Sequence, residues 1–246
     1  MSAERYLETA RKVLERIEKE ELSHVKLAAE VIGQSILNGG TLYVFGTGHA
    51  AIMAQEVFYR AGGLMLVNPI FGPGLTLEVK PATLGSAIER LPGYGKALVE
   101  ASPMKKGDVL IVASPAGRNA LPVEVAMEAK NRGVYIIALT SREWASRVES
   151  RHPSGKKLID VADLIINDGT PVGDAALELE GFKFKVGPVS TIAGVTLMNM
   201  IIAETDVWLI NHGMEPPVFV SANIDGGDEI NRRNLKKYAE RIHYMN

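Results

Sequence analysis

Cysteine is absent from the 246-residue sequence, which excludes disulfides, thiolate metal sites and a cysteine nucleophile. A marked excess of one charge is also missing, since 27 Lys and Arg residues stand against 29 Asp and Glu residues and leave a net charge of −2. Such a chain has no overall field that would attract nucleic acid or an anionic membrane surface. Any anionic ligand must therefore be bound by a local arrangement of residues.

Long uninterrupted apolar runs and a leader-like N-terminus are lacking as well. The opening stretch, MSAERYLETARKVLERIEKEELSH, is too charged for a signal peptide, and the most apolar stretch, 189–210, is interrupted by Asn199, Glu204 and Asp206. These features predict a cytoplasmic protein with no membrane partner. The length and the 46% hydrophobic content suit one domain over 1–246, in which 1–38 forms an N-terminal helical extension.

From residue 41 onwards, β-rich runs alternate with helical stretches. The runs VLIVAS and VYIIALTS are continuously apolar, as strands buried on both faces of a parallel sheet are. This alternation predicts an α/β fold, built from βαβ units around a parallel sheet with helices on both faces. The predicted strands are 41–45, 64–67, 108–113, 134–140 and 162–166, and the predicted helices are 49–61, 94–101 and 119–131.

Helical periodicity also occurs near both ends of the chain. The spacing of Leu7, Leu14 and Ile17 predicts either one long N-terminal helix or two, because the pattern changes phase around 18–24. Residues 190–210 are apolar almost all round and predict a buried helix, and a last helix is predicted over 228–242. Segments 68–93 and 167–188 fit no regular element, and loops of this length are usually functional or mobile.

Two glycine-containing turns follow predicted strands and precede predicted helices. They are VFGTGHAA, with Gly46 and Gly48, and ASPAGRNA, with Gly117. Glycine lets a backbone approach a ligand, and the free N–H groups of a helix N-terminus favour an anion. Each turn alone is weak evidence, because glycine often ends strands for steric reasons. Together with Ser190 and Thr191 at the start of the buried helix, three helix N-termini could converge on one ligand.

Two nucleotide-binding patterns compete with this interpretation. The turn G-T-G-H-A-A puts Ala51 at the third glycine of G-x-G-x-x-G, which a looser pattern allows, but no acidic residue ends the second strand at LVNPIF. The triphosphate motif G-x-x-x-x-G-K-[ST] is absent. Both nucleotide interpretations are therefore disfavoured, and no cofactor is expected. The scattered histidines lack metal-ligand spacing, so no metal is expected either.

Five longer blocks are more specific: VFGTGHAAIMAQEVFYRAGG, VLIVASPAGRNALPVEVAMEAKNRGVYIIALTS, SRHPSGKKLIDVADLIINDGTPVGDAALELEG, KVGPVSTIAG and EPPVFVSANIDGGDE. They resemble successive parts of sugar isomerase (SIS) domain proteins, most closely a single-domain subfamily of bacteria and archaea. The resemblance covers roughly 25–240. It implies a three-layer α/β/α sandwich with a five-stranded parallel sheet, flavodoxin-like and doubly wound. It also implies phosphosugar binding, commonly with aldose–ketose isomerisation or amino-sugar chemistry, in a homodimer or homotetramer.

The resemblance further implies which residues bind the phosphate. In SIS proteins the first turn reads G-x-G-x-S and the second S-x-S-G, and the serine hydroxyls reinforce backbone N–H groups around the phosphate. Here Ala50 and Ala116 stand at two of these serine positions, and only Ser114 is retained. Each charged hydrogen bond lost weakens such a site by about 1.5–3 kcal/mol. The predicted binding residues are Gly46, Thr47, Gly48, Ser114, Gly117, Arg118, Asn119, Thr140, Ser141, Ser190 and Thr191.

Isomerisation also needs an acid and a base beside the reacting carbons. His49 is the leading candidate, since a helix N-terminus disfavours its protonated form, and capping of the turn is an alternative of equal weight. Four acids crowd the stretch NDGTPVGDAALELEG, namely Asp168, Asp174, Glu178 and Glu180, and two carboxyl groups brought close would have the separated pKa values that acid–base catalysis needs. Glu178 and Glu180 are the predicted catalytic carboxylates, although a solvated edge is the simpler explanation for both. Turn chemistry alone could explain Asp168 and Asp174. The predicted function is phosphosugar binding with sugar-phosphate isomerisation; the alternative is a non-catalytic phosphosugar-sensing module.

Overall fold

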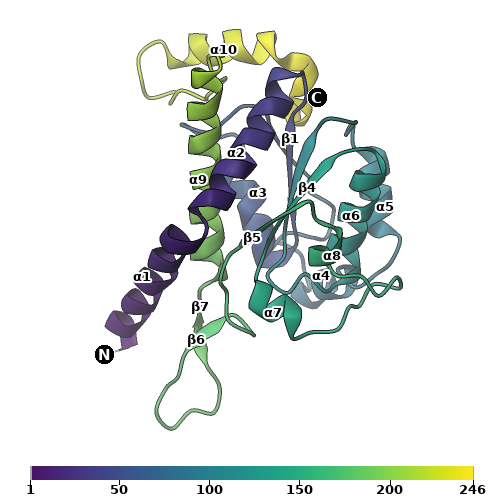
Figure 1. The fold of residues 1–246 in the computed structure, drawn as a ribbon, viewed down its shortest axis with the longest axis vertical. Helices are drawn as coiled ribbons and strands as arrows, with labels where there is room; N and C mark the ends of the chain where they lie inside the picture. The colour runs from purple at the N-terminus through teal and green to yellow at the C-terminus, as the bar shows by residue number, and fades with distance from the viewer. Residues whose placement is uncertain (1, 246) are drawn as a thin grey trace.

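A five-stranded parallel sheet forms the centre of the computed structural model, which describes residues 2–245 (Figure 1). The strand order is β2-β1-β3-β4-β5, and the register aligns Leu42 with both Val67 and Val109. This is the flavodoxin-like, doubly wound order, so the predicted fold class is confirmed. The strands are β1 (Leu42–Gly46), β2 (Val67–Pro69), β3 (Val109–Ala113), β4 (Tyr135–Thr140) and β5 (Leu164–Asn167).

Helices cover both faces of this sheet and complete the predicted three layers (Figure 1). One face carries α1 (Ser2–Glu20), α2 (Leu22–Leu37), α3 (Ala51–Val57) and α9 (Ser190–Asn211). The other carries α4 (Ala82–Ile88), α5 (Tyr94–Ala101), α6 (Ala120–Asn131) and α8 (Leu158–Val161). The short α7 (Arg142–Ser146) follows β4, and α10 (Gly227–Lys237) lies near the C-terminus.

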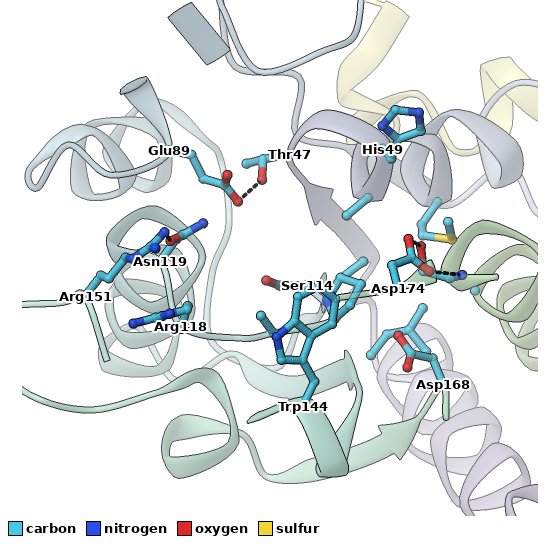
Figure 2. A pocket seen from close by; sticks show the side chains of 18 residues that line it. Thr47, His49, Glu89, Ser114, Arg118, Asn119, Trp144, Arg151, Asp168 and Asp174 are labelled. Atoms are coloured by element: carbon cyan, nitrogen blue, oxygen red, sulfur yellow. Dashed lines mark hydrogen bonds between the residues drawn. The ribbon is translucent and has the colours of Figure 1, made fainter. Parts of the chain in front are cut away.

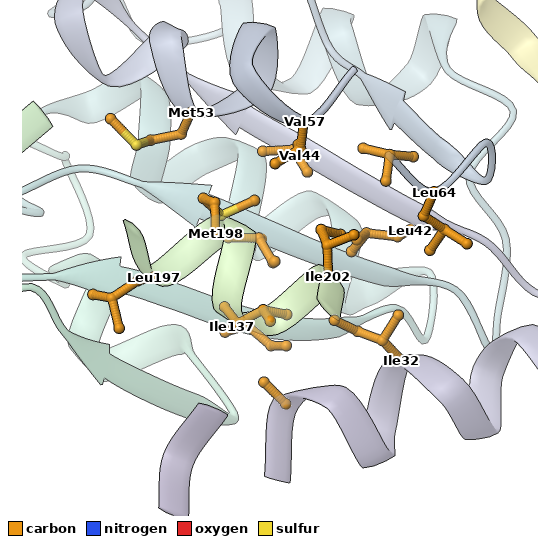
Figure 3. Close-up of a cluster of buried hydrophobic side chains, with 14 of the residues drawn as sticks. Ile32, Leu42, Val44, Met53, Val57, Leu64, Ile137, Leu197, Met198 and Ile202 are labelled. Carbon is orange, nitrogen blue, oxygen red and sulfur yellow. The ribbon is translucent and has the colours of Figure 1, made fainter. Parts of the chain in front are cut away.

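The central strands are buried on both faces. Along β1, Leu42 and Val44 belong to the core cluster under α2, α3 and α9, whereas Tyr43 and Phe45 belong to the cluster under α5 and α6. Successive side chains of a strand alternate between faces, so such a strand must be apolar at every position. Figure 3 shows the first of these clusters, in which Ile202 of α9 also packs. Burial of this kind contributes about 25 cal/mol per Å² of apolar surface.

The N-terminal helical segment is divided at Glu21 into α1 and α2. Glu21 is buried, and its carboxylate accepts a hydrogen bond from the amide of Asn167 at 3.1 Å and pairs with His24 at 3.0 Å. The phase change in the sequence therefore marks two helices. Towards its N-terminus α1 extends away from the sheet (Figure 1), and the Arg16 guanidinium donates to the carbonyl of Gly169 in the loop after β5.

The helix α9 is long and apolar enough, by length and composition alone, to span a membrane. In the fold it is a core helix, since Ala193, Leu197 and Ile201 are completely buried. Its contact with α2 is close: a Cβ added to Gly33 would lie 2.2 Å from Cε3 of Trp208. Glycine at this position is thus required by the packing of α2 against α9.

The strand predicted over 64–67 and the helix predicted over 49–61 have different boundaries in the structure. Residues 64–66 are buried but precede β2, because Leu64 bridges Val218 in the antiparallel sense and the Met65 amide donates to the Pro217 carbonyl. The helix predicted over 49–61 is a 3-10 turn, η1 (Gly48–Ala50), followed by α3. It ends early, at Val57, because Phe58 is extended and Tyr59 then has a φ of 45°.

Both segments predicted to be irregular contain regular structure. Within 68–93 lies α4, and within 167–188 lies an antiparallel hairpin of β6 (Ala175–Leu177) and β7 (Val186–Pro188). These elements are too short to give a clear hydrophobic period, and proline and glycine flank them. The last predicted helix also ends sooner, since α10 stops at Lys237.

Candidate functional site

A cavity of about 330 Å³ lies where the chain leaves the carboxyl ends of the central strands (Figure 2). In doubly wound sheets this is the usual ligand position, because neighbouring connections diverge there. The volume lies within the range of small-molecule pockets. The lining residues are Thr47, His49, Ala50, Met53, Glu89, Ala113, Ser114, Pro115, Ala116, Arg118, Asn119, Leu139, Trp144, Arg151, Asp168, Asp174, Ser190 and Gly194.

All three turns that were expected to converge contribute to this cavity. His49 is exposed at its rim, whereas Ser114 is buried near its centre. Ala50 and Ala116 also line it, so the two departures from the SIS serine pattern face the cavity itself. The predicted site residues in the lining are Thr47, His49, Ser114, Arg118, Asn119 and Ser190.

The other predicted binding residues lie outside the cavity lining. Gly48 and Gly117 adopt φ values of 55° and 57°, which glycine tolerates best. A Cβ on Gly46 would lie 2.3 Å from the carbonyl oxygen of Ala50. These glycines therefore shape the turns rather than face the cavity.

Three hydroxyl residues complete that group. Thr140 Oγ1 donates to the carbonyl of Pro115 at 3.1 Å, and Ser141 Oγ donates to the carbonyl of Thr170 at 2.6 Å. Thr191 is half-buried in the first turn of α9. The hydroxyls of Thr140 and Ser141 thus hold neighbouring loops together.

The structure does not bring Glu178 and Glu180 to the cavity. Both side chains are exposed on the β6–β7 hairpin, which projects from the body of the molecule in Figure 1. Glu178 pairs there with Nζ of Lys185 at 3.2 Å. Their exposed position agrees with the simpler explanation, that both belong to a solvated edge.

Arg118 and Arg151 form one side of the cavity, named here the arginine wall (Figure 2). Their backbones are joined, since the Arg151 amide donates to the Arg118 carbonyl at 2.8 Å. Nε of Arg118 is buried without a hydrogen-bond partner, and Nη1 of Arg151 donates to Oδ1 of Asn119 at 2.9 Å. Loss of solvent and the charges of Arg118 and Arg90 lower the pKa of Arg151. Across residues 2–245 neither wall arginine forms an ion pair.

Asp168 and Asp174 form the other side, named here the aspartate wall (Figure 2). Asp174 Oδ1 accepts hydrogen bonds from the amides of Val189 and Ser190 at 2.9 and 2.8 Å, and its Oδ2 accepts from the Ser190 hydroxyl at 2.6 Å. Asp174 has a φ of 69°, a conformation that aspartate adopts more readily than most residues. The N-terminus of α9 is therefore already bound to a carboxylate of the same chain.

Asp168 is the more deeply buried carboxyl group of this wall. It is only 2% exposed, and its Oδ1 accepts a hydrogen bond from the Thr170 amide at 2.8 Å. Burial, followed by the charge of Asp174, raises the pKa of Asp168 to about 6, against the opposing effects of the Thr170 hydrogen bonds and Arg16. A carboxyl group that titrates near neutral pH is suited to proton transfer.

Between the two walls the cavity has both apolar and polar groups. Trp144, Leu139 and Met53 line this part, and a Cβ on Gly194 would lie 2.5 Å from Sδ of Met53. Glu89 enters from the end of α4 and accepts a hydrogen bond from Thr47 Oγ1 at 2.6 Å. The middle of the cavity thus offers apolar contacts for the carbon skeleton of a ligand, with polar groups of Ser114 and Glu89 beside them.

Five lining residues with a charged or indole side chain were not among the predicted site residues: Glu89, Trp144, Arg151, Asp168 and Asp174. The acidic content of NDGTPVGD was a signal for the two aspartates, but turn chemistry explained it equally well. Arg151 had no signal, because its position follows from the backbone contact with Arg118 across two loops. Within residues 2–245, no group of three His, Asp or Glu side chains is arranged to hold a metal ion.

Comparison with known proteins adds sequence and fold relationships. Residues 5–141 match the sequence model of the SIS domain. The chain is 43% identical to a UPF0309 protein of Shouchella clausii over 98% of both chains, and 42% identical to a UPF0309 protein of Oceanobacillus iheyensis over 94% of both. The solved phosphoheptose isomerase GmhA of Neisseria gonorrhoeae has a similar fold, with a TM-score of 0.55 at 20% identity over 84% of this chain and 97% of that chain.

Proposed function

The chain belongs to the SIS domain family, and from this premise we propose that it binds a phosphosugar and interconverts its aldose and ketose forms. The observation that carries the proposal is the cavity of about 330 Å³ at the strand ends, with a buried guanidinium nitrogen of Arg118 that lacks a hydrogen-bond partner on one wall and a titratable carboxyl group on the other. The fold shared with a phosphoheptose isomerase supports the same reaction class.

Proton transfer through an enediol requires a base near the carbon next to the carbonyl and an acid near the carbonyl oxygen. The cavity offers His49 at its rim, Glu89 beside Thr47 and the buried Asp168. We propose Glu89 and Asp168 for the carboxylate role that sequence analysis assigned to Glu178 and Glu180. Asp168 is well placed for it, because its raised pKa lets it both accept and return a proton near neutral pH.

We also propose that the protein is a cytoplasmic homodimer or homotetramer that acts in sugar metabolism. Large apolar side chains are exposed on the helices of one face, among them Leu7 of α1 and Val207 and Ile210 of α9, at 51%, 50% and 60% exposure. Exposed apolar groups of this size are typical of surfaces that meet another chain. Native mass spectrometry of the purified protein tests the assembly directly.

The enzymatic proposal is tested with a panel of hexose, pentose, heptose and amino-sugar phosphates. A ligand should raise the melting temperature of the wild-type protein and exchange its C2 proton with deuterated water. Exchange should fall in His49→Ala, Glu89→Gln and Asp168→Asn, and remain in Glu180→Gln, whose side chain lies on the exposed hairpin. Binding without C2 exchange would favour the sensing module, and absence of binding by every sugar phosphate would contradict the proposal.

A further inference from the structure

Some backbone donors of the first two glycine turns are already bound within the chain. The Gly48 amide donates to the carbonyl of Leu75 at 2.8 Å, and the Leu121 amide, in the first turn of α6, donates to the carbonyl of Glu89 at 3.1 Å. Pro122, the next residue of α6, has no N–H group. Two donors of these turns are therefore already used, and Pro122 supplies none.

The third turn, at the N-terminus of α9, already binds a carboxylate in place of an anionic ligand. Asp174 already accepts the amides of Val189 and Ser190 as well as the Ser190 hydroxyl. A phosphate at this helix N-terminus would have to displace a carboxylate of the chain and lie beside its negative charge. Ala50 and Ala116 supply no hydroxyl groups either. The region between the turns thus lacks two of the three hydroxyls of the SIS serine pattern and retains that of Ser114.

Positive charge without a partner is found at the arginine wall instead. Arg90 and Arg118 both lie close enough to lower the pKa of Arg151, and Glu89 is the carboxylate that opposes them. Three guanidinium groups beside one carboxylate leave a local surplus of two positive charges. A phosphate monoester carries a charge of about −1.5 to −2 at pH 7, and guanidinium groups match phosphate oxygens with two parallel N–H donors.

We infer that the phosphate of the ligand binds at the arginine wall, to the side chains of Arg118 and Arg151, rather than between Ala50 and Ala116. The ligand class is a phosphate monoester dianion. From this anchor the sugar extends past Trp144 towards Asp168, so its reactive end meets the carboxyl group of the opposite wall. The inference rests on the proposed function for the sugar, whereas the phosphate position follows from the contacts of the chain.

The test measures binding of inorganic phosphate by isothermal titration calorimetry. Arg118→Gln and Arg151→Gln should each weaken binding about tenfold or more, because each removes a charge-assisted hydrogen-bond donor. The matched control is Arg147→Gln: Arg147 is exposed on the neighbouring segment, pairs with Glu143 at 3.1 Å, and should leave binding within about twofold of wild type. Melting temperatures without ligand show that each variant is folded.

A second pair of variants distinguishes the two phosphate positions. Ala50→Ser and Ala116→Ser restore the hydroxyls of the SIS pattern and should change phosphate binding by less than about threefold if the arginines hold the anion. A gain of about tenfold or more in these variants would overturn the inference, since it would place the phosphate between the turns. Absence of phosphate binding by the wild-type protein would overturn it as well.

The outcomes also separate this inference from the proposed function. If phosphate binding depends on both arginines and no sugar phosphate is isomerised, the inference holds and the proposed reaction fails. If a sugar phosphate is isomerised and its KM is unchanged in Arg118→Gln and Arg151→Gln, the reaction holds and the inference fails.

Discussion

The arginine wall and the aspartate wall face one cavity but use their charges in opposite ways. Both carboxylate oxygens of Asp174 accept hydrogen bonds from the N-terminus of α9. Arg118 and Arg151, in contrast, form no ion pair across residues 2–245. Charges satisfied within the chain stabilise the fold, and charges left without a partner lower stability but remain available to a ligand. The cavity therefore separates a stabilising wall from a binding wall.

Asp168 does not fit either description completely. It shares the aspartate wall with Asp174, yet its burial disfavours the ionised form and raises its pKa to about 6. At neutral pH it is a buried carboxylate whose ionisation lowers stability. We therefore expect the aspartate wall to contain one residue that stabilises the fold and one that serves the reaction.

The largest effect is expected from Asp174→Ala, which would remove the cap of α9. The amides of Val189 and Ser190 would lose their acceptor, and the free energy of unfolding should fall by about 3 kcal/mol. For a domain of this size the melting temperature should fall by about 6–12 °C. Asp174→Asn keeps one acceptor oxygen and should lose about half as much. Thermal unfolding followed by circular dichroism checks both, and a loss below about 1 kcal/mol in the alanine variant would refute the stabilising role.

The next effect concerns the pH dependence of stability. Asp168 keeps its proton up to about pH 6 when folded but loses it near pH 4 when unfolded, so the wild-type protein should lose stability as the pH rises between these values. The contribution of Asp168 to this loss should reach at most about 3 kcal/mol and be complete above pH 6. Asp168→Asn retains an acceptor for the Thr170 amide and should show a shallower decline, because the contribution of Asp206 remains; denaturant unfolding from pH 4 to 8 measures the difference.

Asp206→Asn is the matched control for that experiment. Asp206 lies on α9, where burial raises its pKa to about 7, and its position is about 24 Å along the helix from Ser190 at the cavity. This variant should also remove part of the decline in stability with rising pH. Only Asp168→Asn should alter turnover of a sugar phosphate, and equal loss in both variants would contradict a specific role for Asp168.

A smaller effect is expected from Thr47→Val, which removes the hydrogen bond that holds Glu89. The loss of stability should be about 1.5 kcal/mol. The freed Glu89 carboxylate can then turn towards Arg151 and neutralise part of the arginine wall, so phosphate binding should weaken as well. Thr205→Val is the control: Thr205 is buried on α9 and donates to the Ile201 carbonyl at 2.7 Å, so it should lower stability without affecting phosphate binding.

The fold and the two walls differ in how far the sequence determines them. Strands such as β1 and β3 are recognisable because burial on both faces requires an apolar residue at every position. The glycine turns are recognisable because positive φ values favour glycine. Neither rule predicts which amides are already hydrogen-bonded or which loops are in contact. The hydrogen bond from the Gly48 amide to Leu75 and the one from the Arg151 amide to Arg118 could therefore be found only in the three-dimensional structure.

The smallest effect is expected from Gly48→Ala, which tests whether the first turn binds the phosphate or only has an unusual backbone conformation. Gly48 and Gly39 have φ values of 55° and 84°, and no atom lies within 4 Å of a Cβ added to either. Alanine should therefore cost about 1 kcal/mol at each position, from backbone strain alone. If the arginine wall holds the phosphate, Gly48→Ala should bind inorganic phosphate within about threefold of Gly39→Ala, which lies at the end of α2. If Gly48→Ala lost phosphate binding and Gly39→Ala kept it, the first turn would be the phosphate site, and the guanidinium groups would not be.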